Sequence, residues 1–471
     1  MSFVLSPARF LIIAGLSGLV AGCTNTSSLQ QNQPLVPETN AANFDARSLR
    51  DDGLRKFLAD NLGSVPANEW DFETLSWAAF YYNPSLELAR AQWATARAAE
   101  HTASERPNPT LTLTPGYDTT RTPGVSPWMP GINFDFLFPT AGKRGHQQDM
   151  ARNESEAARL AVFSAAWQLR SELRRGLIDA AVASRRESLA RTQANLQEKL
   201  VALLEQRFAI GSVTAGEISN ARALLLRAQA TAADATSLAA VARGHVASSL
   251  GLSLAALNGV TLPVAPTPPT LSPQALATAR RESLQSRSDI LGALAKYLSA
   301  QSALELELAK RVPDFHLGPG YQWDQGDNKW TLGVSFELPI FHRNEAAIGE
   351  AIARRAEAAA QFNLVQSQAI AAIDTAVATL DTTAAQLGRM QKLKLEIEKQ
   401  SAFTQQRLQL GSANQVEVLT ARLDLVTAES AMVDAENAAA VAAGQLEDAL
   451  QLPFPHLAAL ADAAAAKSRT P

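Results

Sequence analysis

The chain has 471 residues, a formal net charge of −4 at pH 7 and a single cysteine, Cys23. One cysteine excludes an intrachain disulfide, and Lys and Arg form no cluster, so no nucleic-acid partner is expected. Beyond the N-terminus the sequence has no run of about 18 apolar residues, so no transmembrane helix is expected there.

The N-terminal segment, residues 1–22, has the pattern of a secretory signal peptide. Arg9 supplies a positive charge, and Phe10–Val20 form a short apolar core. The run Leu19–Cys23 resembles a bacterial lipobox, in which the cysteine is acylated and becomes the first residue of the mature protein. We therefore predict that Cys23 is a lipid attachment site and that residues 23–43 form a lipidated tether. An ordinary signal peptide with an incidental cysteine is the alternative.

Two later segments alternate between apolar and polar residues, at about residues 110–138 and about residues 314–338. Each contains two strands of about nine residues, separated in the second segment by a polar turn at residues 324–329. This is the length of a tilted transmembrane strand. Four strands cannot close a barrel, and open edges in hydrocarbon leave unpaired backbone groups at several kcal/mol each, so a membrane location requires several copies. A small soluble β-subdomain is the alternative.

A long proline-free stretch follows each strand pair. None of the 23 prolines lies between Pro139 and Pro263, or between Pro339 and Pro453. Apolar residues recur at spacings of three and four within residues 370–387, as on one face of a helix. The stretches predict two long helical hairpins, at about residues 142–250 and about residues 343–450, whose longest helices would reach about 100 Å.

The second half of the chain repeats the first at an offset of about 200 residues. Pro139 recurs as Pro339, and the Arg-x-x-x-Gly-Ser sequence that begins at Arg207 recurs at Arg407. The period is far longer than that of a solenoid repeat. The predicted organisation is a signal peptide (1–22), a tether (23–43), a first repeat of helix, strand pair and helical hairpin (44–262), a linker and equatorial segment (263–286), a second such repeat (287–452) and a C-terminal tail (453–471).

This plan resembles the TolC-type outer membrane factors of Gram-negative tripartite efflux pumps and type I secretion. The points of likeness are the duplicated strand pair and helical hairpin, the Arg-x-x-x-Gly-Ser turns and the run Leu338–Asn344 before the second long helix. That run, with Ala141–Arg144 before the first, is most similar to the lipidated branch that serves RND pumps, including heavy-metal cation exporters. The likeness covers about residues 70–452.

The resemblance implies a mainly α fold with a membrane β-barrel portion. In a homotrimer, four strands per chain would close a twelve-stranded barrel, and the long hairpins would continue as an α-barrel. It implies a lipid-anchored passive duct in the outer membrane that extends into the periplasm, without catalysis or cofactor. The implied partners are a periplasmic adaptor and an inner-membrane RND-type transporter, and the implied cargo is metal cations or small toxic compounds.

In that family the helical turns dock the adaptor and close the duct at rest. By resemblance, the docking positions are Arg207, Gly211 and Ser212 in the first turn and Arg407, Gly411 and Ser412 in the second.

Glu417, six residues after the second glycine, corresponds to an acidic residue that lines the aperture of relatives, and Glu217 is its duplicate. Three copies of each would form a ring that attracts cations. The alternative is that each glutamate only complements a helix dipole. Leu408 and Thr420 stand where relatives carry an aromatic residue and an aspartate, so the family's closing contacts are not carried over.

No protease, P-loop, hydrolase or paired-cysteine zinc motif occurs in the body of the chain. We therefore predict no catalytic, cofactor or metal site. His146 and His342 are interpreted as polar groups at a barrel junction, and the alternative is that they form a metal-binding ring in a trimer. Two rival functions stay open: a duct for type I protein secretion, and a soluble periplasmic coiled-coil adaptor or scaffold.

Overall fold

The computed structural model describes residues 36–63, 70–120, 123–263 and 272–453. The predicted signal peptide, the lipid site Cys23, most of the tether and nearly all of the C-terminal tail lie outside these residues. The chain divides into two compact units, residues 1–47 and 48–471.

In the first unit the described part contains one helix, α2 (Pro37–Asp45), none of whose residues is buried. Residues 37–43 of the predicted tether therefore belong to this helix. The reason is local: Pro37 occupies the first helical turn, where its missing N–H costs nothing, and the Glu38 carboxylate complements the N-terminal dipole.

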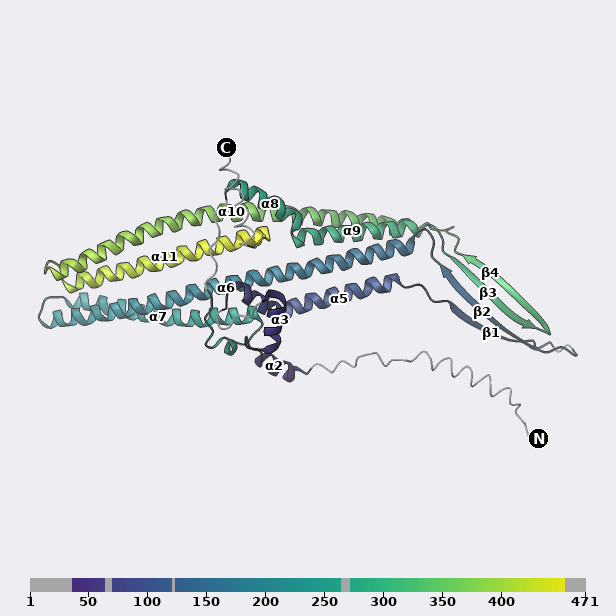
Figure 1. Cartoon of the computed structure of the whole chain (residues 1–471), viewed down its shortest axis with the longest axis horizontal. Helices are drawn as coiled ribbons and strands as arrows, with labels where there is room; N and C mark the ends of the chain where they lie inside the picture. Colours follow the sequence, from purple (N-terminus) through teal and green to yellow (C-terminus); the bar gives the residue numbers. More distant parts are fainter. Residues whose placement is uncertain (1–35, 64–69, 121–122, 264–271, 454–471) are drawn as a thin grey trace, which may run out of the picture. The chain divides into compact units, whose positions relative to one another are not determined.

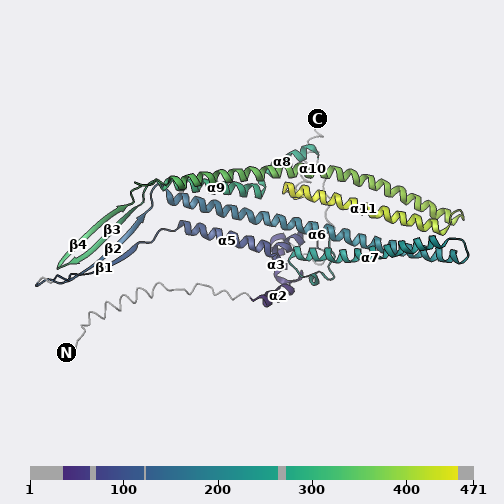
Figure 2. The same cartoon turned by 180° about the vertical axis from the view of Figure 1, so that it is seen from behind.

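The second unit contains the same series of elements twice (Figure 1). The first series is α5 (Pro84–Ser104), β1 (Thr110–Tyr117), β2 (Trp128–Phe138), α6 (Lys143–Ala209) and α7 (Ala215–Leu250). The second is α9 (Ser288–Ala309), β3 (Phe315–Asp324), β4 (Asp327–Phe336), α10 (Glu345–Gln409) and α11 (Gln415–Leu450). The mainly helical fold with four strands is thus confirmed, and the sheet lies beyond one end of the helices (Figure 2).

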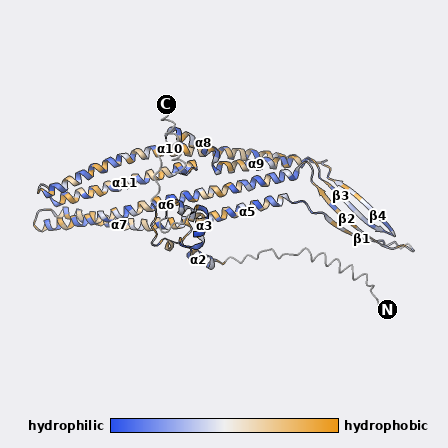
Figure 3. Ribbon diagram, viewed as in Figure 1, coloured by the Kyte–Doolittle hydropathy of each residue, from blue (hydrophilic) through white to orange (hydrophobic). Residues whose placement is uncertain are grey.

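The long helices each pack along two shorter ones. The 67 residues of α6 contact α5 and α7, and the 65 residues of α10 contact α9 and α11. At about 1.5 Å per residue, α6 and α10 are each about 100 Å long. Polar and apolar residues are interspersed along them (Figure 3), and no described helix has the length and apolar composition needed to cross a membrane.

Short helices surround the middle of α6 and α7. They are α3 (Asp52–Leu62), α4 (Phe72–Tyr82), the 3₁₀ turn η1 (Leu254–Leu257) and α8 (Pro273–Ser286). The largest apolar cluster lies where α3 and α4 meet α6 and α7, and Leu54, Leu75, Leu173 and Val246 are each 0% exposed there. Helix α8 occupies part of the expected linker, because Ser272 caps its N-terminus and Ala279 packs against α10 and α11.

The four strands form one antiparallel sheet in the order β1-β2-β3-β4. The polar turn expected at residues 324–329 is shorter in the structure, where only Gln325 and Gly326 separate β3 from β4. Both have positive φ, 52° and 108°, and such a turn matches the twist of the strands that it joins. Strand β4 also ends at Phe336 rather than residue 338, and α10 begins at Glu345 rather than residue 343.

The register gives the sheet one apolar and one polar face. The apolar face carries Leu111, Leu113, Tyr117, Trp128, Ile132, Phe134, Phe136, Phe138, Phe315, Leu317, Tyr321, Trp330, Leu332, Val334 and Phe336. The polar face carries Thr110, Thr112, Thr114, Asn133, Asp135, His316, Gln322, Lys329, Thr331 and Ser335, together with the apolar Met129 and Leu137. Most side chains of the apolar face are solvent-exposed in the single chain, up to 80% for Trp330.

Candidate functional site

The turns that join α6 to α7 and α10 to α11, called here the first and second tips, have the same backbone. Gly211 and Gly411 have φ of 75° and 73°, a left-handed conformation that favours glycine. The N–H of Ser212 donates to the Arg207 carbonyl at 2.9 Å, and that of Ser412 donates to the Arg407 carbonyl at 2.8 Å. These are the helix-ending bonds of a Schellman motif, so the predicted docking residues form two matched tight turns.

At the first tip, Glu217 and Thr214 cap helix α7. The Glu217 N–H donates to Thr214 Oγ1 at 3.3 Å, while the Thr214 N–H and hydroxyl donate to Glu217 Oε2 at 2.6 and 2.8 Å. The backbone bond, followed by the hydroxyl bond, lowers the pKa of the Glu217 carboxyl. Glu217 therefore does more than complement the helix dipole: together with Thr214 it forms a full capping box. The sequence signal for this motif is the spacing Thr-x-x-Glu.

The second tip has a corresponding capping box and one further ion pair. Asn414 caps α11, accepting the Glu417 N–H at 3.1 Å and donating its amide to Glu417 Oε1 at 2.7 Å. Arg407 donates to the Ser412 carbonyl at 2.7 Å and lies 3.7 Å from Glu417 Oε2. Among the described residues, the Arg207 guanidinium has no such bond, so the two tips present their arginines differently.

The capping box at the first tip predicts a pH dependence that Thr214→Ala should reduce. Because the folded pKa of Glu217 is lowered, the cap stabilises the start of α7 above the unfolded pKa, about 4.3, and is lost as the pH falls through the folded pKa. At pH 7 the variant should show about fivefold less amide-exchange protection over residues 215–219. The difference should narrow as the pH falls through the folded pKa of Glu217, because the carboxylate bonds are then lost and only the bond from the Glu217 N–H to the Thr214 hydroxyl still distinguishes the two proteins. Equal protection in both proteins at pH 7 would contradict the capping role.

An apolar cluster holds the two hairpins together near the tips. Leu196 of α6 packs there with Leu419 and Val426 of α11. Farther from the tips, Arg186 of α6 pairs with Asp434 of α11 at 2.5 Å. Contacts between α6 and α11 therefore fix both tips at the same end of the helices (Figures 1 and 2).

A buried charge cluster, Arg170, Arg174, Glu447 and Asp448, joins the middle of α6 to the last turn of α11. Glu447 is 0% exposed and pairs with Arg174, which is 2% exposed, and with Arg170 at 2.8 Å. Arg174 also bonds Asp448, and Arg170 lies 4.6 Å from the ring centre of Phe72 in α4. Burial lowers the pKa of both guanidinium groups. Sequence reasoning missed this cluster, because its members are far apart in the chain.

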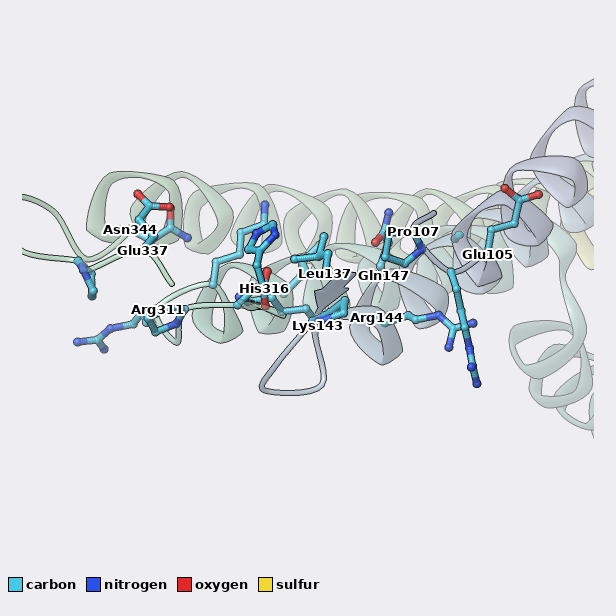
Figure 4. A pocket seen from close by; sticks show the side chains of 18 of the residues that line it. Glu105, Pro107, Leu137, Lys143, Arg144, Gln147, Arg311, His316, Glu337 and Asn344 are labelled. Carbon is cyan, nitrogen blue, oxygen red and sulfur yellow. Dashed lines mark hydrogen bonds and ion pairs between the residues drawn. The ribbon is translucent and has the colours of Figure 1, made fainter. Parts of the chain in front are cut away.

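A cavity of about 1000 Å³ lies where the strands meet the helices (Figure 4). On its wall the Lys143 ammonium donates to Asp314 Oδ1 at 2.7 Å and to the Val312 carbonyl at 2.6 Å. Asp314 also accepts the Thr140 N–H at 2.8 Å, and these bonds outweigh burial and lower its pKa. The guanidinium of Arg343 lines the cavity without a hydrogen bond or ion pair to any described residue.

The two histidines considered for a metal ring have different surroundings. His146 lies 3.2 Å from Glu305 Oε2, and His342 lines the cavity at the strand–helix junction. Within the described ranges, no three His, Cys, Asp or Glu residues are grouped so that they could hold a metal ion.

Comparison with known proteins identifies the family. The family described as "Outer membrane efflux protein" matches residues 78–252 and 279–450. The nickel-cobalt-cadmium resistance protein NccC of Alcaligenes xylosoxydans xylosoxydans is 25% identical over 250 residues, which cover 52% of this chain and only 55% of NccC. The chain thus matches about half the length of this relative.

Solved structures share the fold. The outer membrane protein VceC from Vibrio cholerae superimposes with a TM-score of 0.67 and 22% identity, over 81% of this chain and 96% of VceC. The open state of the MtrE outer membrane channel of Neisseria gonorrhoeae gives 0.66 and 18%, over 80% of this chain and 88% of MtrE. Because the family match covers most of the sequence, as the resemblance predicted, this chain belongs to the outer membrane efflux protein family.

Proposed function

We propose that this protein is the outer-membrane channel of a tripartite efflux system, in which three copies close one twelve-stranded barrel and continue as an α-barrel across the periplasm. The observation that carries the proposal is the sheet, which has one apolar face, one polar face and edge strands β1 and β4 each paired on one side only. Unpaired edges cost several kcal/mol per backbone group in hydrocarbon, so identical neighbours supply the missing partners.

Aromatic pairs at the two ends of the apolar face support a membrane location. The rings of Tyr117 and Trp128 lie 4.9 Å apart at the turn end, and those of Phe138 and Phe315 lie 5.1 Å apart at the helix end. Transmembrane β-barrels carry such aromatic girdles at both membrane interfaces. A soluble scaffold would need a cover for this face, for example over Trp330, which is 80% exposed. The membrane channel is therefore the better supported function.

The same proposal assigns a function to the N-terminus and to the two tips. Cys23 carries the lipid anchor in the outer membrane, and the tips dock a periplasmic adaptor that connects the channel to an inner-membrane RND-type transporter. The docking residues are Arg207, Gly211, Ser212, Arg407, Gly411 and Ser412. The channel itself is passive, and the transporter supplies the energy.

Glu217 and Glu417 form the aperture of the trimer in this proposal. Both side chains are exposed at the tips, and their capping boxes fix the carboxylates near the helix turns. Six carboxylates in a ring would attract cations. The name of the relative NccC refers to resistance to nickel, cobalt and cadmium. Divalent metal cations are therefore our proposed cargo, and a polypeptide cargo is the second candidate.

Conductance across a lipid bilayer tests the function and the aperture together. The wild-type protein should form cation-selective channels, and the double variant Glu217→Gln, Glu417→Gln should lower the cation-to-anion permeability ratio several-fold because the negative ring is lost. Glu154→Gln, an exposed position near the start of α6, is the matched control and should change nothing. Unchanged reversal potentials in the double variant would exclude both residues from the aperture, whereas a wild type that does not conduct and is also monomeric in mild detergent would reject the channel.

A further inference from the structure

The wall of the cavity at the strand–helix junction carries more positive than negative charge. Four segments form it: those that follow α5 and α9, and those at the starts of α6 and α10 (Figure 4). Its basic residues are Arg106, Lys143, Arg144, Lys310, Arg311 and Arg343. Its acidic residues are Glu105, Asp314 and Glu337. The chain as a whole has a net charge of −4, so the positive excess is local to this cavity.

Only two of these basic residues are neutralised by an acidic neighbour. Lys143 pairs with Asp314 at 2.7 Å, and Lys310 pairs at 2.6 Å with Glu307, which does not line the cavity. The other four, called here the wall arginines, have no ion pair with any described residue; they are Arg106, Arg144, Arg311 and Arg343. Even with Glu307 included, the positive charges at this junction exceed the negative ones by two.

One wall arginine, Arg144, also carries a buried donor that lacks an acceptor. Its Nη2 atom donates to the Ser104 carbonyl, but its Nε atom is buried without a hydrogen-bond partner among the described residues. A buried donor that makes no hydrogen bond is costly, and more so when it belongs to a charged group. An acceptor atom supplied by a ligand in the cavity would remove this cost.

The start of α6 favours a ligand of the same sign. The N-terminus of a helix carries a partial positive charge, which acidic residues usually complement. Helix α6 instead begins with Lys143 and Arg144, and it has neither a side-chain cap nor an acidic residue in its first turn. Its counterpart α10 begins with Glu345. An anion in the cavity would therefore complement the helix dipole as well as the wall arginines.

We propose that this cavity binds a soluble oxyanion of the phosphate or carboxylate class, with the wall arginines as its donors. A guanidinium group presents a planar fork of N–H donors that matches both kinds of anion. The volume of about 1000 Å³ is large enough for a small organic phosphate or carboxylate.

The choice of a soluble anion over a lipid headgroup rests on the proposed channel. Leu137 and His316 line the cavity and lie on the polar face of the sheet, which is turned to the lumen and away from lipid in that proposal. An anion bound there would also offset positive charge that would otherwise repel the divalent cations proposed as cargo.

Protection from chemical modification tests the site in the unaltered full chain. Phenylglyoxal modifies accessible arginines, and peptide mass spectrometry locates the modified residues. Inorganic phosphate, added at constant ionic strength, should slow modification of the wall arginines at least about fivefold at saturation, because bound anion excludes the reagent. Arg389, exposed in α10 without an ion pair to any described residue, should keep its rate. Unprotected wall arginines would overturn the proposal.

Calorimetric titration with inorganic phosphate measures the contribution of single arginines. Arg144→Gln and Arg343→Gln should each weaken binding about tenfold, because each removes a charge-assisted hydrogen bond. Arg389→Gln is the matched control and should leave the affinity unchanged. The Arg343 guanidinium has no bonded partner among the described residues, so its replacement keeps the test valid if Arg144→Gln does not fold. Equal weakening in Arg343→Gln and Arg389→Gln would show that phosphate responds to overall charge and would overturn the site.

Two further outcomes separate this site from a lipid site and from the channel itself. Mixed micelles that contain phosphatidylglycerol should not protect the wall arginines, and protection by this lipid but not by phosphate would overturn the soluble anion. Conductance without phosphate protection would reject the anion site and leave the channel. Protection in a monomeric protein that does not conduct would support the site and reject the channel.

Discussion

Replacing Glu447 by alanine is expected to lower the free energy of unfolding by about 3–5 kcal/mol. The Glu447 carboxylate is 0% exposed and lies between Arg170 and Arg174 in the interface of α6 and α11. Its removal leaves the Arg174 guanidinium, 2% exposed, with Asp448 and the Gly444 carbonyl as its remaining partners on α11. A buried charge that loses one of its counter-charges regains no water to replace it. Urea unfolding in detergent, followed by the helical circular dichroism signal, measures the loss.

The same two helices provide a matched control. Asp434 pairs with Arg186 at 2.5 Å, but their side chains are 59% and 47% exposed. Asp434→Ala should therefore cost at most about 1 kcal/mol, because water replaces the lost partner and screens the pair. Equal losses for Glu447→Ala and Asp434→Ala would show that burial does not set the strength of this interface.

Gly251→Ala is expected to destabilise the protein by about 2–4 kcal/mol, of which about 1–2 kcal/mol comes from the left-handed backbone and the rest from overpacking. Gly251 ends α7 with φ of 72°. A Cβ there would lie 2.8 Å from the Tyr82 carbonyl oxygen and 3.0 Å from Asn83 Cα. The obstacle is backbone, and it is held in place because the Asn83 amide donates to the Ser249 carbonyl at 3.0 Å.

Gly411→Ala separates the two contributions. Gly411 has nearly the same φ, 73°, but nothing lies within 4 Å of the position of its Cβ. This variant should lose only the backbone share, about 1–2 kcal/mol. Urea unfolding of both variants checks the difference. If Gly411→Ala lowers the free energy of unfolding as much as Gly251→Ala does, the contact of the new Cβ at position 251 with Tyr82 and Asn83 does not contribute to the destabilisation.

The sequence alone predicted the long helices and the four strands because their signals are local. A helix forms hydrogen bonds between residues four apart, so proline-free stretches with apolar residues at spacings of three and four indicate it directly. Alternation marks the strands for the same reason, since neighbouring side chains point to opposite faces. The duplication, visible from Pro139 and Pro339, then predicted that each element occurs twice.

The candidate site was predicted only in part. The sequence located the tips through Gly211 and Gly411. Their left-handed φ could be predicted because it depends on the residue type and its immediate neighbours rather than on distant parts of the chain. It did not show that Glu217 belongs to a capping box or that Arg407, unlike Arg207, bonds its own turn. The Thr-x-x-Glu signal was present for the first feature, but nothing local distinguishes the two arginines.

The sequence by itself thus determined what each segment becomes: two long helical hairpins, two strand pairs and two tight turns in a repeated order. Tertiary structure alone decided how the two repeats pack on each other and which of their charged side chains meet. The pairing of Arg174 with Glu447 and of Lys143 with Asp314 joins residues far apart in the chain. A charge carries no local signal of its partner, because an exposed and a buried ion pair use the same residue types. Only packing fixes which charges lose contact with water and must be paired.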